Sequence, residues 1–578
     1  MRRRSLLAPL AAALLLVGCT ADDGSAPTLT PTPEPLSSEP TTPAAPAVLA
    51  TDDPAALAVA ASQTLFASAP VVVLASPDAA LRAASAATAL GVPVLLDGDD
   101  AAVAAEITRL AARAVLTVGD AAPPEGVADV VSVAAPADDD ALRSLLSDQL
   151  GETTPVGAGG EVAAVAGLDA QQPALLAPES PAPAPAAGEP SVAPEGAGAS
   201  PAPSDAAAEV PSPEDATSDG GAGADGTLPS TARPEPVAAG TVVMSTGDPA
   251  QTAAVATARS AGAAVEVVPT GDPRATSETV QATAASSPDV VVGLGTAFGD
   301  AETLAWRTAT AATGTELPGG GQLVLPGKTY VALYGSPGTA ALGVLGEQDG
   351  PATVQRARDH ADQYRALTDN QVVPALEIIA TVASAGPGDD GNYTAERPVE
   401  ELRPLVDLAH EHGQYVVLDL QPGRTDFLTQ AKAYEELLRM PNVGLALDPE
   451  WRLGADQVHL RQIGQVDVAE VNQVVTWLAD LTRANNLPQK VLVLHQFQVR
   501  MIPGVDGVDQ SRSELAVLVH VDGQGSQPAK QGTWGTLRAS APSIGWWGWK
   551  NFYDEDRPML TPEQTMQVQP TPNFISYQ

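Results

Sequence analysis

Two apolar runs, "YVVLDL" (residues 415–420) and "VGLALD" (443–448), each carry an Asp at or next to the carboxyl end. Short apolar runs separated by segments of helical length are typical of buried parallel strands joined by crossover helices. Five similar runs follow residue 327: "TYVALYG" (329–335), "VPALEIIAT" (373–381), "VLVLHQF" (491–497), "LAVLVHVD" (515–522) and "SIGWWGWK" (543–550). Residues 327–578 have the usual length of a (β/α)8 barrel, so we predict this α/β fold, with "FISYQ" (574–578) or "QLVL" (322–325) as the eighth strand.

Polar and titratable residues recur near the carboxyl ends of these strands. They are Glu377, Asp419, Asp448 with Glu450, His495 with Gln496, and His520 with Asp522. In a (β/α)8 barrel all these ends meet at one face, where active sites of this fold are built. Each residue also has a structural explanation, as a helix cap, an ion-pair partner or a core histidine. Together they favour a site, because burying many ionisable groups on one rim is costly unless they are solvated or used.

The sequence "GLALDPEWRL" (444–453) places two carboxylates at one strand end. In an extended chain, residues two apart face the same way and lie about 6.6 Å apart. Pro449 has no N–H and would end the strand between Asp448 and Glu450. Two carboxylates facing one pocket are the groups that glycoside hydrolases use. Glu450 is therefore our candidate general acid/base, with Asp448 as its partner.

Further side chains would shape the substrate site around this pair. We assign this role to Glu377, Asp419, His495, Gln496, His520, Asp522, Trp547 and Lys550. The last two come from "GWWGWKNFYDED" (545–556), where sugars could stack on indole rings and Lys550 could bind an anionic group. Packing in the barrel core explains the tryptophans equally well.

The Asp-x-Glu pattern at the fourth strand is similar to the muramidase family of lysozyme-type βα barrels. That resemblance implies a general-acid role for Glu450. The first strand lacks the opening Asp-Val-Ser signature of this family and reads "VALYGSPG" (331–338) instead. What remains is a broader resemblance to glycoside-hydrolase barrels, which implies an envelope glycan as substrate.

Two other functions stay open. The Asp, Glu and His residues at the strand ends include suitable metal ligands, so a metal-dependent hydrolase is one alternative, although no His-x-His occurs on the first strand. The other is a scaffold that binds wall polymer without cleaving it. "GLGTAFG" (293–299) lacks the spacing of a dinucleotide fingerprint, and our leading hypothesis involves no cofactor and no metal.

The region before residue 327 has a different composition, with no Lys and no Tyr. Apolar runs at 71–75, 94–96, 115–118, 130–133 and 162–165 alternate with Ala-rich helical stretches, which predicts a Rossmann-like parallel-sheet unit over 49–169. A similar pattern returns over 239–326 and predicts a second unit. Between them, 170–238 is rich in Pro, Ala and Gly and is predicted to be a disordered linker.

Both units resemble the type 2 cell-wall-binding repeat of Gram-positive surface proteins. The residues that carry this resemblance are Pro77, Asp78 and Ala79, then Leu90, Gly91 and Pro93, then Val118 and Gly119. The second unit keeps the layout but few of these residues. The resemblance implies that the chain binds cell-wall polysaccharide or peptidoglycan.

The first twenty residues, "MRRRSLLAPLAAALLLVGCT", resemble a bacterial lipoprotein signal of an actinobacterial type. This implies cleavage after residue 18, lipidation of Cys19 and a disordered tether over 19–48, which would hold the chain on the outside of the cell membrane by its lipid anchor alone. The formal net charge of −40 argues against a nucleic-acid partner, because phosphate binding depends on Lys and Arg.

Overall fold

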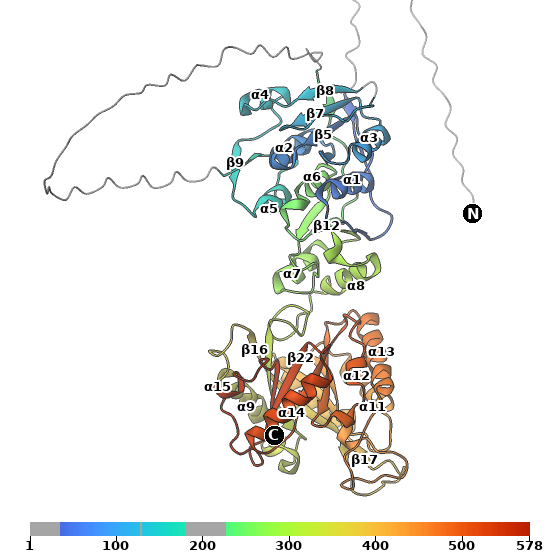
Figure 1. Cartoon of the computed structure of the whole chain (residues 1–578), viewed down its shortest axis with the longest axis vertical. Coiled ribbons are helices and arrows are strands. Elements are labelled where there is room, and N and C mark those ends of the chain that lie inside the picture. Colours follow the sequence, from blue (N-terminus) through green and yellow to red (C-terminus); the bar gives the residue numbers. More distant parts are fainter. Residues whose placement is uncertain (1–34, 128–129, 180–226) are drawn as a thin grey trace, which may run out of the picture.

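The computed structural model describes residues 35–127, 130–179 and 227–578. An α/β body precedes residue 327, and a barrel follows it (Figure 1). The predicted signal peptide, Cys19 and residues 180–226 of the predicted linker lie outside the described residues. None of the helices in the described ranges combines the length and the hydropathy needed to cross a membrane.

Eight parallel strands form the closed barrel, which confirms the predicted fold of this region. They are β15 (Lys328–Gly335), β16 (Gln371–Ala383), β18 (Tyr415–Leu420), β19 (Val443–Leu447), β20 (Lys490–Gln496), β21 (Leu515–Val521), β22 (Trp546–Asn551) and β23 (Phe574–Tyr577). β15 pairs with both β16 and β23, which closes the ring. The "FISYQ" segment therefore supplies the eighth strand. The "QLVL" segment forms no strand, and its Val324 packs among the apolar residues inside the barrel.

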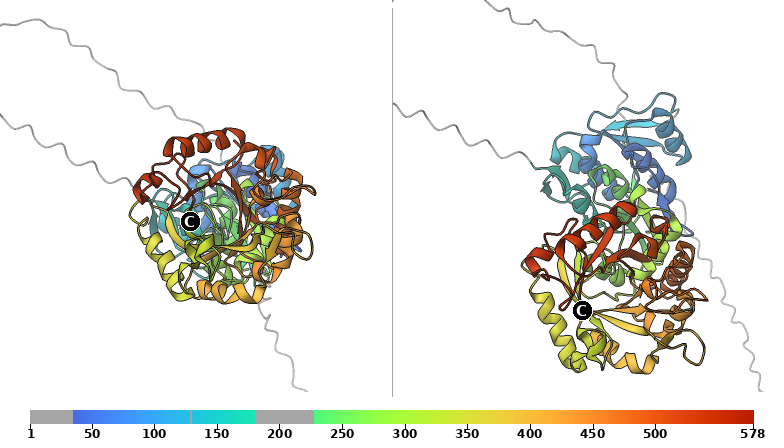
Figure 2. Two further views of the ribbon diagram at one scale, coloured as in Figure 1. Left: turned by 90° about the horizontal axis from the view of Figure 1, so that it is seen from below. Right: turned by 60° about the horizontal axis from the view of Figure 1, so that its bottom comes forward.

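Helices surround the barrel when it is viewed along its length (Figure 2). They are α9 (Gly350–Asp362), α10 (Val399–Glu411), α11 (Phe427–Ala433), α12 (Glu435–Leu438), α13 (Val468–Ala484), α14 (Gln527–Ser540) and α15 (Pro562–Thr565). A short strand, β17 (Thr394–Glu396), pairs antiparallel with the end of β16.

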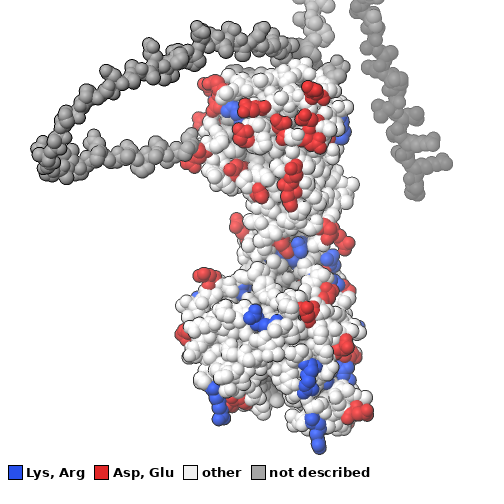
Figure 3. Space-filling model, in the orientation of Figure 1, with Lys and Arg blue, Asp and Glu red and all other residues white. Residues whose placement is uncertain are grey.

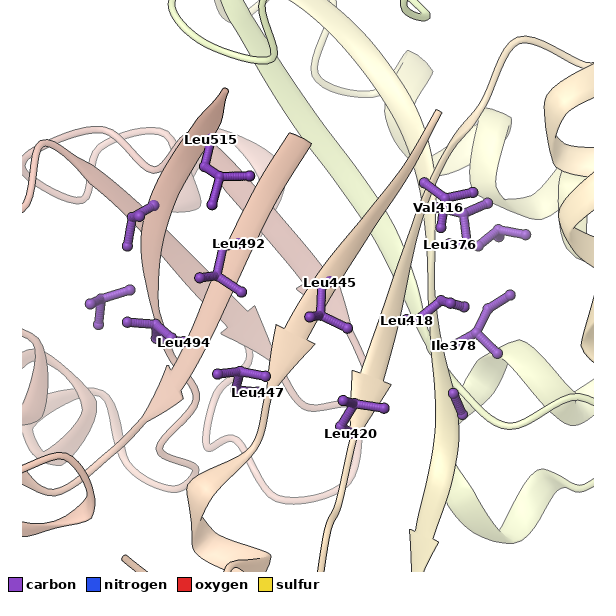
Figure 4. Packing of buried hydrophobic residues seen from close by; sticks show 14 of the residues in the cluster. Leu376, Ile378, Val416, Leu418, Leu420, Leu445, Leu447, Leu492, Leu494 and Leu515 are labelled. Carbon is purple, nitrogen blue, oxygen red and sulfur yellow. The ribbon is translucent and has the colours of Figure 1, made fainter. Parts of the chain in front are cut away.

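Side chains alternate along the barrel strands, apart from an irregularity in β16 between Ile379 and Thr381. Leu418, Leu445 and Leu492 point outward and pack against the helices (Figure 4). Val417 and Ala446 alternate with them and fill the lower interior with other apolar residues. Each fully buried leucine contributes roughly 1.5–3 kcal/mol relative to exposure, so the outer apolar layer fixes the register of every strand.

The α/β body contains two four-stranded parallel sheets with matching strand order. The first sheet runs β6 (Val94–Leu96), β5 (Val71–Ala75), β7 (Ala114–Val118), β8 (Val131–Ala134). The second runs β13 (Ala264–Val267), β12 (Thr241–Ser245), β14 (Val290–Leu294), β3 (Ala47–Leu49). The parallel-sheet units predicted here are therefore confirmed. The edge strand β3, however, comes from the segment that precedes the first unit, so the two units are interleaved.

Three assignments predicted from the sequence need correction: the tether, the linker and one strand. Residues 36–49 were assigned to a tether, but they form β1 (Leu36–Ser37), β2 (Glu39–Pro40) and β3, which pair with β11 (Thr231–Ala232), β4 (Phe66–Ser68) and β14. The outer ends of the predicted linker contain β10 (Leu175–Pro178), paired with β9 (Thr153–Val156), and β11. Residues 162–165 form part of α5 (Glu161–Ala166) rather than a strand, because Val162 and Val165 share one helix face and are buried together.

Helices rich in Ala join the two units into one core. α2 (Ala80–Leu90) packs against α6 (Thr252–Ser260), and α1 (Pro54–Leu65) also contacts α6. The small side chains of Ala84, Ala87 and Ala254 are fully or almost fully buried, and they allow the helices to approach closely. The remaining helices are α3 (Asp100–Arg109), α4 (Asp139–Leu145), α7 (Ser277–Ser286) and α8 (Ala301–Ala311).

One side chain of α6 protects the edge of the first sheet. The Thr257 hydroxyl accepts a hydrogen bond from the Val94 amide at 3.0 Å and donates one to the Val94 carbonyl at 3.3 Å. β6 is an edge strand, so these backbone groups have no neighbouring strand to pair with. A residue of the second unit thus completes the first.

The barrel and the α/β body meet at the amino-terminal ends of the barrel strands. The Arg274 guanidinium lies 4.5 Å from the ring centroid of Trp306 and donates to the Ser513 carbonyl, just before β21. Arg483 of α13 lies 4.7 Å from the same ring. Trp306 therefore contacts two guanidinium groups, one from each body. The carboxyl-terminal mouth of the barrel opens at the opposite end.

Charge is distributed unevenly between the two bodies. Figure 3 shows Asp and Glu over the visible face of the α/β body, with Lys and Arg more frequent on the barrel. This agrees with the sequence, in which the first Lys is Lys328.

Replacing Thr257 by Val should weaken the contact between the two units. Val keeps the shape but leaves the Val94 amide and carbonyl without partners, so we expect the free energy of unfolding of the α/β body to fall by about 1–3 kcal/mol. Hydrogen exchange at Val94 should accelerate. Thr108→Val, at an exposed position of α3, is the control, and an equal effect of both substitutions would contradict the role of Thr257.

Candidate active site

A cavity of about 410 Å³ opens at the carboxyl-terminal mouth of the barrel. Four of the residues predicted from the sequence line it: Asp448, Glu450, Asp522 and Lys550. The other lining residues are Tyr334, Ala341, Leu342, Ile379, Val382, Ala383, Gln421, Trp451, Phe497, Gly523, Gln524, Phe552 and Gln578. The strand ends thus bring acidic groups, a lysine and aromatic rings to one opening.

Asp448 and Glu450 reach the cavity by a different route from the one predicted. β19 ends at Leu447, and Asp448 precedes a 3-10 helix that spans Pro449–Trp451. Pro449 therefore begins a helical turn and does not separate two residues of an extended chain. The extended conformation assumed for this pair is therefore wrong, but both residues still line the same cavity.

A row of buried polar side chains lies beneath the cavity. His495 on β20 is fully buried, and its Nε2 lies 2.8 Å from Oε1 of Glu377. Its Nδ1 lies 3.1 Å from Oδ2 of Asp522. A protonated imidazole donates at both nitrogens, so it can satisfy both carboxylates. His495 thereby joins β16 to β21 across the interior.

The same row contains a second hydrogen-bonded carboxylate. The Tyr334 hydroxyl donates to Oδ2 of Asp419 at 2.8 Å, and the Gln421 amide donates to that hydroxyl at 3.3 Å. Asp419 is fully buried, and burial, partly offset by the charge of His495, raises its pKa to about 6. Asp419 and Glu377 therefore lie under the cavity and do not line it.

The protonation of His495 and that of Asp522 depend on each other. Burial alone would lower the pKa of His495, but the charge of Glu377 and the bond to Asp522 outweigh burial and raise this pKa well above its ordinary value. Burial alone would raise the pKa of Asp522, but the bond to His495 holds it below its ordinary value. At neutral pH Asp522 is therefore ionised.

Glu450 and Asp448 are shifted in the opposite direction. Burial and the nearby charge of Asp522 raise the pKa of Glu450 to about 7. Burial, reinforced by the charges of Glu450 and Asp419, raises the pKa of Asp448 well above its ordinary range. The cavity thus holds an ionised carboxylate, Asp522, beside two carboxyl groups that retain protons near neutral pH. Such a difference is the usual basis for assigning a base and an acid.

His520 is buried beside His495 and does not line the cavity. Its Nε2 lies 2.7 Å from the Ser576 hydroxyl on β23. Burial and the charge of His495 lower the pKa of His520 well below its ordinary value, so it is neutral. Its ring lies over Gly548 of the neighbouring strand, where an added Cβ would come within 2.2 Å of Nδ1. The glycine is thus needed to accommodate the histidine.

Trp547 and Gln496, both predicted to contact substrate, face away from the cavity. Trp547 faces the outer layer of the barrel, where its ring lies 5.8 Å from that of Trp534 and its indole donates to the Ile544 carbonyl. Gln496 follows His495 and so points to the other side of the strand, where its amide donates to the Gln498 carbonyl at 3.2 Å. Both placements follow from the alternation of side chains along a strand. Gln496 is one residue from the inward-facing His495, and Trp547 is three residues from the inward-facing Lys550, so both point outward.

Sequence reasoning missed several cavity residues. Tyr334 and Gln421 both lie at strand ends, which is the signal that could have identified them. Trp451, Phe497 and Phe552 follow strands directly and place three aromatic rings around the opening. Their positions at the end of a predicted strand, or two to three residues beyond it, were the available signal.

No group of three His, Cys, Asp or Glu side chains in the described ranges is arranged to hold a metal ion. The geometry of His495 gives a reason, since both ring nitrogens are bonded to carboxylates and no lone pair faces a cation. His495, one of the ligands considered for a metal-dependent hydrolase, is therefore occupied by Glu377 and Asp522.

Comparisons with known proteins give only weak similarities. No family model matches the chain, and no curated protein matches it. Among solved structures, Cwp6 from Clostridium difficile shows 13% identity and a TM-score of 0.31, with 66% of this chain aligned to 63% of that chain. A cellobiohydrolase mutant in the closed form shows 12% identity and a TM-score of 0.19, with 48% and 69% covered. The chain thus spans less than two thirds of the Cwp6 structure, and neither similarity is strong enough to show a shared function.

Substituting Gly548 by Ala should disturb the buried histidine. The new methyl group would overlap the His520 ring, and overpacking of this kind costs about 1–3 kcal/mol in the free energy of unfolding. Gly545→Ala is the matched control, because an added Cβ there meets no atom within 4 Å. Chemical denaturation of both variants tests this, and equal stabilities would contradict the packing of His520 on Gly548.

Asp448→Asn should change how stability depends on pH. In the unfolded chain an Asp titrates at about 3.9, whereas in the folded protein burial raises the pKa of Asp448. The contribution of Asp448 to stability is therefore complete below about pH 4 and is lost as pH rises through the raised pKa. Asn cannot ionise, so the stability of the variant relative to the native protein should increase from pH 4 to pH 9.

Thermal unfolding across this pH range measures the effect. Asp456→Asn, at an exposed position of the following loop, serves as the control and should give a nearly constant difference. A constant difference for Asp448→Asn as well would show that Asp448 ionises normally in the folded protein.

Proposed function

We propose that this protein is a cell-surface lipoprotein whose barrel hydrolyses a glycosidic bond in an envelope glycan. The observation that carries the proposal is the opposite shift of two carboxyl groups in one cavity. The pKa of Glu450 is raised to about 7, while that of Asp522 is held below its ordinary value by His495. Glycoside hydrolysis needs one protonated and one ionised carboxyl group at the same bond.

In this mechanism Glu450 donates its proton to the glycosidic oxygen as the bond to the anomeric carbon breaks. The ionised Asp522 stabilises the positive charge that develops on the sugar ring. A water molecule supplies the new hydroxyl group, and its proton is taken up by a carboxylate of the pair. The anomeric configuration of the first product distinguishes direct attack by water from an intermediate bonded to Asp522.

Asp522 replaces Asp448 as the proposed partner of Glu450. Asp448 is 2% exposed and carries a raised pKa, so it is protonated when Glu450 must act. A neutral carboxyl group can donate a hydrogen bond to a sugar oxygen but cannot serve as a base. The roles of the two aspartates therefore follow from His495, which bonds to one and not to the other.

The remainder of the chain would hold the barrel at its substrate. We assign wall binding to the two α/β units and membrane attachment to a lipid on Cys19. The barrel contacts the α/β body through the amino-terminal ends of its strands, as at Ser513. Its cavity therefore opens away from the body, toward polymer that the body does not cover.

Glu450→Gln should lower the hydrolysis of purified wall glycan by about 100- to 10,000-fold, the usual contribution of a general acid. Asp522→Asn should cause a loss of similar size, whereas Glu400→Gln, on the exposed face of α10, should leave activity unchanged. Release of reducing sugar by the full-length chain is the measurement. Full activity of Glu450→Gln would contradict the proposal, and wall binding without any release of sugar by the native protein would favour a non-catalytic scaffold.

The pH dependence of the same reaction should identify the acid. Because Glu450 must be protonated to act, the rate should fall as pH rises through about 7. Because the bond to His495 lowers the pKa of Asp522, the rate should not fall on the acid side until the pH is below the ordinary titration range of an Asp. A rate that is constant from pH 6 to pH 9 would assign the proton donation to another group.

A further inference from the structure

Lys550 occupies an unusual position on the wall of the cavity. It lies at the carboxyl end of β22, its side chain points into the barrel, and it is 3% exposed. Its Nζ lies 3.6 Å from the ring centroid of Tyr334 and 5.2 Å from that of Phe552. These two rings hold the ammonium group by cation–π contact, but they accept no ordinary hydrogen bond.

Three other lysines of the barrel are buried, and each has an oxygen partner. Lys328 donates to the Leu323 carbonyl at 2.8 Å, and Lys490 donates to the Met440 and Val443 carbonyls. Lys530 donates to the Lys550 carbonyl and to Asp556, both at 2.7 Å. This is the normal behaviour of a buried ammonium group, which has three protons to share.

Lys550 lacks any such partner in the described part of the chain. Its Nζ makes no hydrogen bond there, and no carboxylate oxygen of those residues lies within 4.0 Å of it. Glu450 and Asp522 are near enough for the charge of Lys550 to lower the pKa of each. They are nevertheless not paired with it. All three residues line the same cavity, so a ligand bound there can contact the ammonium group as well as these carboxyl groups.

Two oxygen atoms on the same wall also lack partners. Oδ1 of Asp448 and Oδ1 of Asp522 are buried and accept no hydrogen bond, and the two residues are 2% and 8% exposed. A buried polar atom without a partner is costly, so such atoms mark the positions of ligand groups or ordered water. A sugar hydroxyl group could donate to either oxygen after a rotation of the carboxyl group, because each oxygen has almost no accessible surface as it stands. The ammonium group needs an acceptor instead.

We infer that the glycan bound in this cavity carries an oxyanion, either a carboxylate or a phosphate, and that Lys550 binds it. The inference rests on the proposed function and names the class of its substrate, an acidic rather than a neutral glycan. The oxyanion would supply the acceptor that the other buried lysines already have. Hydroxyl groups of the same sugar would donate hydrogen bonds to the two aspartate oxygens.

Binding of small probes to the full-length chain tests this inference without requiring catalysis. The probes are methyl glucuronide, its neutral methyl ester, methyl glucoside and glucose 6-phosphate, with dissociation constants measured by NMR titration. The native protein should bind the glucuronide or the sugar phosphate at least 10-fold more tightly than the ester and the glucoside. Whichever anion is preferred identifies the chemical source of the charge.

Lys550→Met should abolish this preference, so that the charged and neutral probes bind with similar affinity. Lys550→Arg should restore part of the preference, because it keeps the charge. Lys432→Met, at an exposed position of α11, removes the same charge elsewhere and should have no effect. Because the preference is a ratio measured within one protein, a small loss of stability in a variant does not affect it.

Equal affinity of the native protein for all four probes would overturn the inference, as would a preference that survives in Lys550→Met. The outcome is separable from that of the proposed function. Cleavage of neutral and acidic glycans with equal kcat/KM would overturn the inference and leave hydrolysis standing. An anion preference together with no release of sugar from any glycan would leave Lys550 as a binding residue and remove the hydrolysis.

Discussion

A closed parallel barrel forces its side chains to alternate between the helical layer and the interior, and this constraint organises the barrel domain. Leu418 and Leu445 face outward, so Asp419 and Ala446 must face inward. The lower interior is filled mainly by apolar residues, and the bonded row of Glu377, His495 and Asp522 lies above them, toward the mouth. Apolar burial therefore fixes the register, and the register places the ionisable groups, although burying those groups is itself unfavourable.

The buried imidazole of His495 offsets part of the cost of burying these ionisable groups. Two carboxylates from different strand ends share its two nitrogens, so the imidazole is fully hydrogen-bonded and each carboxylate has one bonded oxygen. One of these carboxylates, Asp522, also reaches the cavity and stays ionised there. Asp448 and Glu450 have no such partner, and their carboxyl groups retain protons near neutral pH. The difference in pKa among the carboxyl groups that line the cavity therefore originates at His495, which lies beneath the cavity and does not contact a ligand.

Local sequence predicted the strands of the barrel because apolar length and flanking segments encode them directly. It also selected four cavity residues, since a group at a strand end can be located without knowing its contacts. It could not say which of Lys550 and Trp547 faces inward, because both faces of β22 are apolar enough to be buried. It also missed that β3 pairs with β14, since such a pairing depends on residues far apart in the chain and leaves no local pattern. The contacts of His495 with Glu377 and Asp522 could not be predicted for the same reason.

The pairing of β3 has a mechanical consequence for the direction in which the cavity opens. β3 belongs to the earliest described segment, yet it is hydrogen-bonded to β14 in the second unit. That unit contacts the barrel through Arg274 and Trp306, which pack against Ser513 and Arg483. A load applied at the amino-terminal side therefore reaches the barrel through paired strands and stacked side chains. Because these contacts lie at the amino-terminal ends of the barrel strands, the mouth of the cavity is held facing away from the α/β body.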